Sequence, residues 1–375
     1  MTSGPVVVAP DKFKGSLTAP EVVGAITAGL RRYRPDLEVR PAPIADGGDG
    51  TLEAVAAHGY APVPVQVSGP NGTAIEAAFG RLDRTAVVEL AEASGLRRLT
   101  GGRLNPMTAG SRGTGDLIRA ALDLGCDHVV LGLGGSAGTD GGAGMLQALG
   151  VRLLDRRGHE LGPGGAALAT VHRVDLTGLD PRLADTEVVL ATDVDNPLLG
   201  PSGAAAVYAP QKGATPAQVD ELEQALANWA RLLGEAVGQD RSAAPGAGAA
   251  GGVGFAALTA LRAEPRPGIE LILELINFEQ MLSDAALVIT GEGSLDRQSL
   301  HGKAPVGVAT AAARHAVPTV AVAGRCELTE AELRAGGLVG AYALTSIEPD
   351  PAVCFTDAAR LLEELVATAL APAWI

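Results

Sequence analysis

Cysteine, aromatic residues and positive charge are all scarce in this sequence, and these scarcities exclude several classes of protein. The chain of 375 residues has 3 cysteines, an odd number without a Cys-x-x-Cys pair, which argues against a disulfide framework and a zinc site. Lys and Arg number 29 against 43 Asp and Glu, so the net charge of −14 should repel nucleic acids and anionic membranes. No apolar run reaches about 18 residues without Gly or a charge, so we expect no membrane span.

The same features favour a cytoplasmic protein. Three cysteines without a pairing pattern fit a reducing compartment. The opening residues, Met1-Thr-Ser-Gly-Pro-Val-Val-Val, lack the basic and long apolar regions of a signal peptide. We therefore expect cytoplasmic localisation and small-molecule partners, with no nucleic acid and no membrane, and either a monomer or a homodimer.

Small apolar residues and glycine are what the sequence has in abundance. Hydrophobic residues make up 47% but aromatic residues only 3%, so the core must consist mainly of Ala, Val and Leu, which suit parallel strands and buried helices. The 50 glycines must lie in turns or where backbone approaches a ligand. At roughly 150 residues per domain, the length suggests about two domains.

Short apolar runs alternate with helical patterns along the chain. Two capping boxes, Thr18 with Glu21 and Thr215 with Gln218, predict helices that run toward Tyr33 and stop at Gly238. Further helices are expected at 116–124, 145–149, 303–315 and 357–370, and buried strands at 5–9, 37–44, 85–90, 128–133, 187–192, 285–290, 318–323 and 340–344. This order predicts parallel βαβ units in two α/β domains, residues 1–64 with 283–375 and residues 65–282.

The Gly- and Ala-rich stretch 243–254 allows two interpretations. Its composition is typical of a flexible linker. It could equally be a glycine-rich loop that opens a helix at Val253 and lies against a ligand. Composition alone leaves both open.

Two motifs near the amino terminus follow predicted strands, where parallel α/β sheets bind ligands. In Asp11-Lys-Phe-Lys-Gly-Ser-Leu-Thr, Lys12 or Lys14 with the Ser16 hydroxyl at a helix start would suit a carboxylate or phosphate. Asp46-Gly-Gly-Asp-Gly-Thr packs two carboxylates among glycines. The alternatives are a solvated turn before a capped helix and an ordinary Asp-Gly turn.

The segment Gly132-Leu-Gly-Gly-Ser-Ala-Gly-Thr-Asp-Gly-Gly has six glycines in eleven positions and could form a backbone nest around phosphates. Its Gly132-x-Gly134-x-x-Ala137 spacing, with Asp155 about twenty residues on, also fits a dinucleotide-binding loop. That spacing is the main argument for an NAD-dependent hydroxy-acid dehydrogenase. It is weak because glycine is so frequent that chance spacings are expected.

Carboxylates and cations recur in two later segments. Asp193 and Asp195 follow a predicted strand and could supply a general base or a Mg²⁺ ligand, unless they only form an Asx-turn before Pro197. Lys212 precedes the long helix. Glu292, Asp296, Arg297 and Lys303 mix both charge signs within about a dozen residues, as a surface ion-pair cluster also would.

Together these segments describe phosphoryl transfer, since glycine loops, cations and carboxylates suit phosphates, developing charge and metal or base chemistry respectively. The sequence has no Gly-x-Ser-x-Gly or His-Glu-x-x-His motif, and its 6 histidines show no metal-binding spacing. A lysine-containing phosphate loop of the Gly-x₄-Gly-Lys-Ser/Thr type is also absent from it.

The order of these motifs resembles the type-1 glycerate kinase family of bacteria. Ala9-Pro-Asp-Lys-Phe-Lys-Gly-Ser-Leu-Thr-Ala is similar to its opening signature, and Ala45-Asp-Gly-Gly-Asp-Gly-Thr to its second block, where Glu is common at the position of Asp49. The match continues through Asn105-Pro, Gly113-Thr-Gly-Asp-Leu-Ile, Gly134-Gly-Ser-Ala, Asp193-Val-Asp-Asn-Pro-Leu, Gln211-Lys-Gly-Ala, Gly248-Ala-Ala-Gly-Gly and Gly291-Glu-Gly-Ser-Leu-Asp-Arg-Gln. It spans nearly the whole chain.

The resemblance implies ATP-dependent phosphorylation of D-glycerate with Mg²⁺, with 2-phosphoglycerate favoured as product. It implies a discontinuous Rossmann-like parallel-sheet domain and a second α/β domain, with the active site expected in the cleft between them. It also makes residues 245–254 a family motif rather than a linker. A kinase of another small hydroxy acid remains an alternative, as does a non-catalytic binder of sugar acids.

Our sequence hypothesis assigns a role to each candidate residue. Asp193 is the expected base, with Asp296 and Glu292 as rivals, and Asp193 and Asp296 are the expected metal ligands. Lys14 is expected to act in catalysis and in binding glycerate, together with Asp11, Ser16, Asp46, Gly47 and Gly48. The residues expected to bind the nucleotide are Gly134, Gly135, Ser136, Asp140, Gly141, Lys212, Glu292 and Lys303.

Two departures from the family pattern concern fine specificity. Gly138-Thr139 stands where Thr-Asn is more common in the family, and Ser111-Arg112 where an aromatic residue is common. Either could alter nucleotide or substrate contacts without removing the proposed aspartates.

Overall fold

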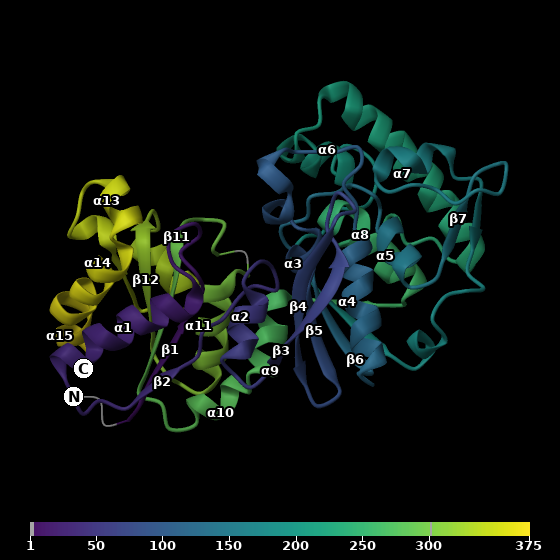
Figure 1. The fold of residues 1–375 in the computed structure, drawn as a ribbon. Helices are drawn as coiled ribbons and strands as arrows, with labels where there is room; N and C mark the ends of the chain where they lie inside the picture. Colours follow the sequence, from purple (N-terminus) through teal and green to yellow (C-terminus); the bar gives the residue numbers. More distant parts are fainter. Residues whose placement is uncertain (1–3, 301) are drawn as a thin grey trace. The chain divides into compact units, whose positions relative to one another are not determined.

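The computed structural model describes residues 4–300 and 302–375 and divides the chain into two compact units (Figure 1). Unit 1 comprises Met1–Asp46, Glu53–Gly59 and Pro267–Ile375, and unit 2 comprises Gly47–Leu52 and Tyr60–Arg266. The first three residues, on which part of the argument about a signal peptide rests, and His301 lie outside the described residues. A division into domains at residues 64 and 283 stays a prediction, because a compact unit is not a demonstrated folding domain.

The described part of unit 1 contains a parallel sheet of five strands in the order β13-β12-β11-β1-β2. These are β1 (Val6–Pro10), β2 (Val39–Pro41), β11 (Leu287–Leu295), β12 (Thr319–Cys326) and β13 (Gly340–Ala343). From β1 the chain moves outward to β2, whereas from β11 it moves the other way to β12 and β13. The strand order therefore reverses between β1 and β11, and such a switch point is where open α/β sheets bind ligands.

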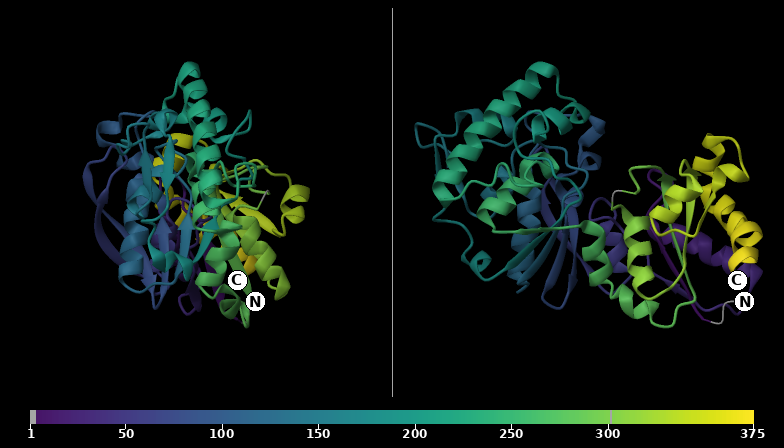
Figure 2. Two further views of the ribbon diagram at one scale, coloured as in Figure 1. Left: turned by 90° about the vertical axis from the view of Figure 1, so that its right-hand side faces the viewer. Right: turned by 180° about the vertical axis from the view of Figure 1, so that it is seen from behind.

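Helices cover both faces of this sheet (Figures 1 and 2). Val320 and Val322 of β12 pack with residues of α1 (Ala19–Tyr33) and α14 (Ala358–Leu365). Ala321 and Ala323, which point to the opposite face, pack with α11 (Ala304–Arg314) and α12 (Glu330–Ala335). The other helices around this sheet are α9 (Gly268–Leu275), α10 (Phe278–Leu282), α13 (Pro351–Thr356) and α15 (Ala371–Trp374).

The main sheet of unit 2 is mixed, with the order β10-β9-β6-β5-β4-β3. Its parallel strands are β5 (Thr85–Glu89), β6 (His128–Gly132), β9 (Glu187–Ala191) and β10 (Glu264–Arg266). The antiparallel strands β3 (Ala61–Ser68) and β4 (Ala74–Leu82) extend one edge, and β7 (Arg152–Leu154) pairs with β8 (Arg173–Asp175). We predicted none of the strands β3, β4, β7, β8 and β10. Strand β3 gives little signal because it is an edge strand that holds two prolines and buries little of its length.

The helices of unit 2 surround a core centred on the parallel strands. They are α3 (Leu90–Ser94), α4 (Arg112–Asp123), α5 (Ala143–Ala148), α6 (Ala204–Tyr208), α7 (Pro216–Val237) and α8 (Ala249–Ala260). A further short helix, α2 (Thr51–Ala56), crosses the unit boundary. The side chain of Trp229 on α7 is fully buried in this core.

Several local predictions are confirmed and two are corrected. The capping boxes at Thr18 and Thr215 are both present, and α7 ends at Gly238 with a φ of 81°. Residues 246–254 are mostly buried, and Ala250, Gly251 and Gly252 have left-handed φ values of 53°, 69° and 90° before the regular part of α8. A flexible linker there is therefore wrong, and the glycine-rich segment that opens a helix near Val253 is confirmed. The strand expected at 285–290 continues to Leu295, because its parallel pairing with β12 extends past Glu292. Glu292 is therefore a strand residue rather than a loop residue.

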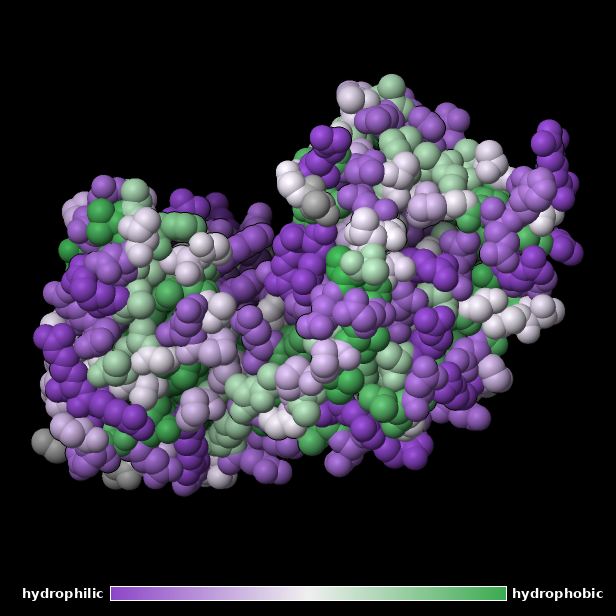
Figure 3. All heavy atoms as spheres, viewed as in Figure 1, coloured by the Kyte–Doolittle hydropathy of each residue, from purple (hydrophilic) through white to green (hydrophobic). Residues whose placement is uncertain are grey.

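Among the described residues, no helix is long and apolar enough to cross a membrane. Figure 3 shows hydrophobic residues scattered among hydrophilic ones on the face in view. All three cysteines, Cys126, Cys326 and Cys354, are free thiols.

Candidate active site

The switch point of unit 1 gathers the ends of three strands. Asp11 follows β1, and its backbone N–H donates to the carbonyl of Gly291 in β11 over 2.8 Å. The N–H of Ile44, which precedes the Asp46 loop, donates to the carbonyl of Pro10 over 3.1 Å. Asp11, Asp46 and Glu292 consequently lie at one sheet edge, close enough that each of the other two raises the pKa of Asp11.

Asp11 is the most perturbed of these carboxyls. It is buried, and burial is the main reason why its pKa rises to about 7, with Asp46 and Glu292 adding to the rise. The neighbouring Lys12 opposes this shift through its backbone N–H at 2.6 Å and its ammonium at 3.7 Å from Oδ1. A carboxyl with such a pKa can exchange a proton near neutral pH.

Glu292 has a pKa raised first by burial and then by Asp296 and Asp46, while Ser299 and Lys303 lower it. Its Oε1 atom is buried and has no hydrogen-bond partner among the described residues. An unsatisfied, buried carboxylate oxygen suits a hard cation. In the part of the chain that the structure describes, no group of three or more His, Cys, Asp or Glu is arranged to hold a metal ion. Mg²⁺ nevertheless commonly uses one or two carboxylates with phosphate oxygens.

In the loop that contains Lys14, the Ser16 hydroxyl and the start of α1 bind groups of the protein itself, whereas we expected them to bind an anion. Lys14 is exposed, but the Ser16 hydroxyl donates to the carbonyl of Phe355 over 2.6 Å. The start of α1 is occupied by its own capping box, in which Thr18 bonds with Glu21. The single hydroxyl proton of Ser16 and the helix terminus are therefore already used, and of these groups Lys14 is the one open to an anion.

In unit 2, the two glycine-rich motifs lie backbone against backbone. A Cβ atom on Gly132 would lie 2.4 Å from the carbonyl oxygen of Gly47, and one on Gly134 would lie 2.5 Å from the Cα of Gly48. The packing of the backbone at residues 47–48 thus accounts for the lack of a side chain at Gly132 and Gly134 without a dinucleotide. Asp155 accepts hydrogen bonds from its own turn, at Arg157 and His159, instead of facing the loop. Both observations argue against the dinucleotide-binding interpretation.

The second half of the loop is buried and held by Asp140. Its carboxylate accepts hydrogen bonds from Ser111 N (2.8 Å), Ser111 Oγ (2.9 Å), Gly142 N (3.2 Å) and Gly144 N (3.2 Å). The serine that departs from the family pattern is thus a partner of this aspartate. With these acceptor sites occupied, Asp140 ties the start of α4 to the start of α5.

Close packing also explains the other glycines of this loop. Trp229 Nε1 donates to the carbonyl of Gly141 over 2.9 Å, and a Cβ atom on Gly141 would meet the Trp229 ring. A Cβ atom on Gly138 would lie 2.6 Å from the carbonyl oxygen of Ala109, which accounts for glycine at that departure. Gly134 and Gly135 remain accessible, and the φ of Gly135 is 68°. This turn is the part of the loop that a phosphate could reach.

Lys212, expected to contact the nucleotide, is 2% exposed. Its ammonium donates to Ser136 Oγ over 2.8 Å and to the carbonyl of Gly138. Burial lowers the pKa of Lys212 to about 7, against an opposing effect of Asp140. The lysine therefore lies beneath the loop rather than on its surface.

Asp193 is exposed just beyond the end of β9, the strand next to β6. The N–H of Leu133 donates to the carbonyl of Ala191 over 3.4 Å, so the segments that follow β6 and β9 start side by side. Asn196 fixes the next turn, since it accepts from Tyr208 (2.6 Å) and donates to Ser202 (2.7 Å). Asp193 and the open Gly134–Gly135 turn therefore belong to the same sheet edge.

Sequence reasoning missed an ion-pair network at the end of β5. Glu89 is 1% exposed and accepts from Leu52 N (3.1 Å) and Arg97 Nη2 (3.0 Å), while Arg97 also pairs with Asp49 and Glu92. Burial raises the pKa of Glu89 to about 7. The sequence feature that could have revealed this network is an acidic residue, Glu89, at the end of a predicted strand. The network anchors the Asp46–Thr51 motif.

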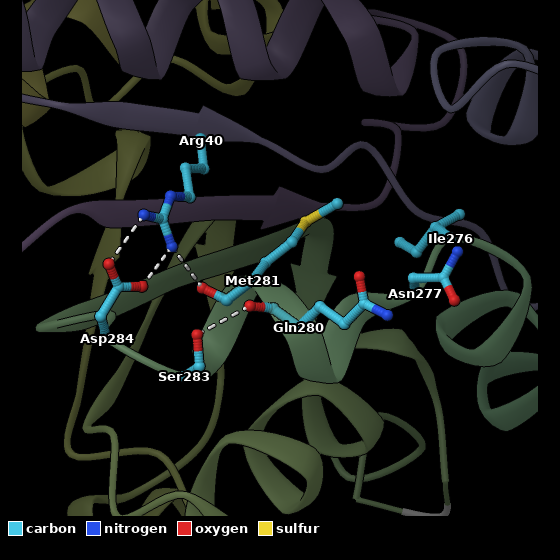
Figure 4. A pocket seen from close by; sticks show the side chains of 7 residues that line it. All are labelled: Arg40, Ile276, Asn277, Gln280, Met281, Ser283 and Asp284. Atoms are coloured by element: carbon cyan, nitrogen blue, oxygen red, sulfur yellow. Dashed lines mark hydrogen bonds and ion pairs between the residues drawn. The ribbon is translucent and has the colours of Figure 1, made fainter.

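A hollow of about 520 Å³ in unit 1 is lined by Arg40, Ile276, Asn277, Gln280, Met281, Ser283 and Asp284 (Figure 4). Arg40 is paired there with Asp284 and Glu38. Asp284 lies just before β11, so this hollow is near the amino end of that strand, away from the edge where such sheets bind ligands.

The predicted site residues are divided between the units. Unit 1 holds Asp11, Lys14, Ser16, Asp46, Glu292, Asp296 and Lys303, and unit 2 holds Gly47, Gly48, Gly134, Gly135, Ser136, Asp140, Gly141, Asp193 and Lys212. Each set lies on its own unit, and their convergence in one cleft stays a prediction.

Carboxylates at parallel strand ends, together with a glycine-rich turn and lysines, are the equipment of a phosphotransferase acting on a small substrate. Comparison with known proteins agrees with this class. The sequence model of the Glycerate kinase family matches residues 6–373. Glycerate kinase of Bacillus subtilis (strain 168) is 48% identical over 323 residues, covering 85% of this chain and 84% of that protein.

Two further relatives point the same way. Glycerate 2-kinase of Escherichia coli (strain K12) is 45% identical over 322 residues, 85% of this chain and 84% of that protein. A crystal structure attributed to glycerate kinase 2 of Salmonella typhimurium LT2 superposes with a TM-score of 0.84 at 41% identity, covering 99% of this chain and 100% of that one. The chain belongs to the glycerate kinase family, and it is an enzyme that phosphorylates glycerate with ATP. The predicted family, fold class and enzyme class are confirmed.

Proposed function

We propose that the protein transfers the γ-phosphoryl group of ATP to the 2-hydroxyl of D-glycerate, giving 2-phosphoglycerate and ADP. The observation that carries this proposal is that Asp193 and the open Gly134–Gly135 turn follow neighbouring parallel strands. A carboxylate beside a phosphate cradle suits an attack by a hydroxyl on a phosphoryl group. The printed name of the Escherichia coli relative supports the 2-position.

In this proposal Asp193 is the base that orients the glycerate hydroxyl and accepts its proton. Its exposure keeps the carboxylate accessible to substrate. Asp296 is the rival for this role, at the end of β11 in unit 1. A general base of this kind contributes about a hundredfold or more to the rate.

The proposed glycerate-binding groups come mainly from the unit 1 edge. Lys14 binds the substrate carboxylate as an exposed cation. Asp11 and Asp46 accept from the substrate hydroxyls, and Gly47 and Gly48 offer backbone N–H groups. Ser16 acts indirectly, since its hydroxyl holds the loop against Phe355.

The proposed nucleotide contacts centre on Gly134 and Gly135, with Ser136 at the buried side of the turn. Lys303, at the start of α11, supplies positive charge to the phosphates. Asp140 and Gly141 support the loop from within, as their hydrogen bonds to Ser111 and Trp229 suggest.

Mg²⁺ is the cation that phosphoryl transfer implies, and it would neutralise charge on the phosphate oxygens. The unpartnered Oε1 of Glu292 fits a hard cation. Asp193 and Asp296 are the proposed ligands from sequence, and Glu292 is added to that set. Each would supply carboxylate oxygen, the ligand type that Mg²⁺ prefers.

The deciding experiment is ADP release by the purified protein with D-glycerate, with and without Mg²⁺, followed by ³¹P NMR of the product. We expect ADP and 2-phosphoglycerate in equal amounts and little turnover without the metal. A 3-phosphoglycerate signal would contradict the regiochemistry alone. Preference for lactate or another hydroxy acid would favour the alternative kinase, and glycerate-dependent reduction of NAD would favour the dehydrogenase.

Cytoplasmic localisation is part of the proposal, because cytoplasm supplies ATP and keeps the three free thiols reduced. The state of assembly, monomer or homodimer, is a prediction that light scattering of the purified protein would decide.

A further inference from the structure

The buried lysine of unit 2 has an unusual set of neighbours. Lys212 ends the short 3₁₀ turn Pro210–Lys212, and its ammonium donates to Ser136 Oγ and to the carbonyl of Gly138. Both acceptors are uncharged. Gly251, with a φ of 69°, closes the other side, since a Cβ atom there would lie 2.8 Å from Nζ. The ammonium is thus enclosed by the glycine loop and cannot reach a surface ligand without rearrangement.

This contact determines what the Ser136 hydroxyl can do. An ammonium only donates, so Ser136 Oγ must accept from Lys212. Its own proton then points away from Nζ, and no described residue accepts it. Ser136 is 9% exposed and directly follows the accessible Gly135. The hydroxyl is therefore held as a donor beside the open turn.

We propose that Lys212 is a positioning residue that fixes the Ser136 hydroxyl as a hydrogen-bond donor to a phosphate oxygen of ATP at the Gly134–Gly135 turn. This inference rests on the proposed placement of ATP at that turn. It changes the expected role of Lys212, which acts through Ser136 rather than on the phosphate itself.

Energetics support a functional reason for the lysine. A buried ammonium that has only uncharged hydrogen-bond partners is costly to desolvate. The lowered pKa of Lys212 reflects the same cost. An apolar side chain of similar length would fill the space without this penalty, so stability alone does not favour lysine.

The test is a double-mutant cycle with Ser136→Ala, Lys212→Met and the double variant, measuring MgATP affinity by calorimetry and the KM for ATP. We expect each single change to lower the affinity for MgATP and to raise the KM for ATP, each about tenfold. The double variant should bind MgATP at most about twofold more weakly than either single variant. The kcat at saturating ATP should change much less. Thr259→Val is the matched control, because it removes a buried hydroxyl without a hydrogen-bond partner from α8 of the same unit.

Additive losses would overturn the inference, because they would mean that Lys212 acts on the phosphate independently. Unchanged ATP affinity in Ser136→Ala would also overturn it, and that outcome is decisive even if Lys212→Met does not fold. Calorimetry needs no glycerate. If the losses of ATP affinity are non-additive but the protein does not phosphorylate glycerate, the proposed function is refuted and the inference about Lys212 stands.

Discussion

The exposed pair Lys14 and Asp193 and the buried pair Lys212 and Asp140 carry the same charges in opposite surroundings. Asp140 accepts hydrogen bonds from Ser111, Gly142 and Gly144, and Lys212 donates to Ser136 and Gly138. Lys14 and Asp193 instead lie exposed after strands β1 and β9. The comparison teaches that a charged residue in a glycine-rich motif can bind the ligand or hold the loop that binds it.

The largest expected catalytic effect is at Asp193. Asp193→Asn keeps the size but removes the basic carboxylate, so kcat should fall about a hundredfold or more with MgATP affinity nearly unchanged. The melting temperature should stay within about 2 °C of wild type, since exposed substitutions rarely destabilise much. Stopped assays and calorimetry measure the two quantities. A near-normal kcat would transfer the base role to Asp296.

A substitution of Asp140 should lower the stability of the protein more than its catalytic rate, in contrast to Asp193→Asn. Asp140→Asn places an amide NH₂ against backbone donors in a buried site, which costs on the order of 3 kcal/mol. With about 2.1 cal/mol/K of unfolding entropy per residue, this corresponds for 375 residues to a melting temperature lower by roughly 4 °C. Calorimetric scans with activity per folded molecule test this. Normal melting with lost ATP binding would place Asp140 among the ligand contacts.

Lys14→Ala should have a moderate effect confined to one substrate. Removal of the exposed ammonium should raise the KM for D-glycerate about tenfold, while kcat and the KM for ATP change less than about threefold. Lys14→Arg serves as the matched control that keeps the charge. A defect seen with ATP alone would contradict the placement of Lys14 at the carboxylate of glycerate.

A pH dependence of stability is expected from Asp11, whose pKa rises to about 7 from 3.8. Between these values the native state keeps a proton that the unfolded state has lost, so this residue lowers stability as pH rises through the window. Asp11→Asn removes that dependence. Its urea midpoint relative to wild type should therefore increase from about pH 5 to pH 7. A constant difference would show that Asp11 titrates normally.

The sequence was sufficient to predict the family and those helices and strands that have strong local signals. Capping boxes at Thr18 and Thr215 locate α1 and α7 because the bonds that define them join residues three apart. Motif order identified the phosphotransferase. The edge strand β3 was missed because its prolines and exposed residues give no buried periodicity.

The roles inside the glycine loop could not be predicted, because they depend on contacts between distant segments. Burial of Lys212 under Ser136 joins residues 76 apart, and the bond from Ser111 to Asp140 spans 29. Glu89 was missed for the same reason, since Arg97 and the loop at Asp49 meet it only in the folded chain.

The pairing of β1 with β11 affects how the protein can be synthesised. Val6 lies opposite Leu287, so strand β1 has no neighbour on that side until the segment that contains Leu287 has been translated. Residues 60–266 of the second unit are complete earlier and can fold while the amino-terminal segment waits. Chains that stop before residue 287 would therefore leave an apolar segment, Val6–Pro10, open to chaperones and aggregation.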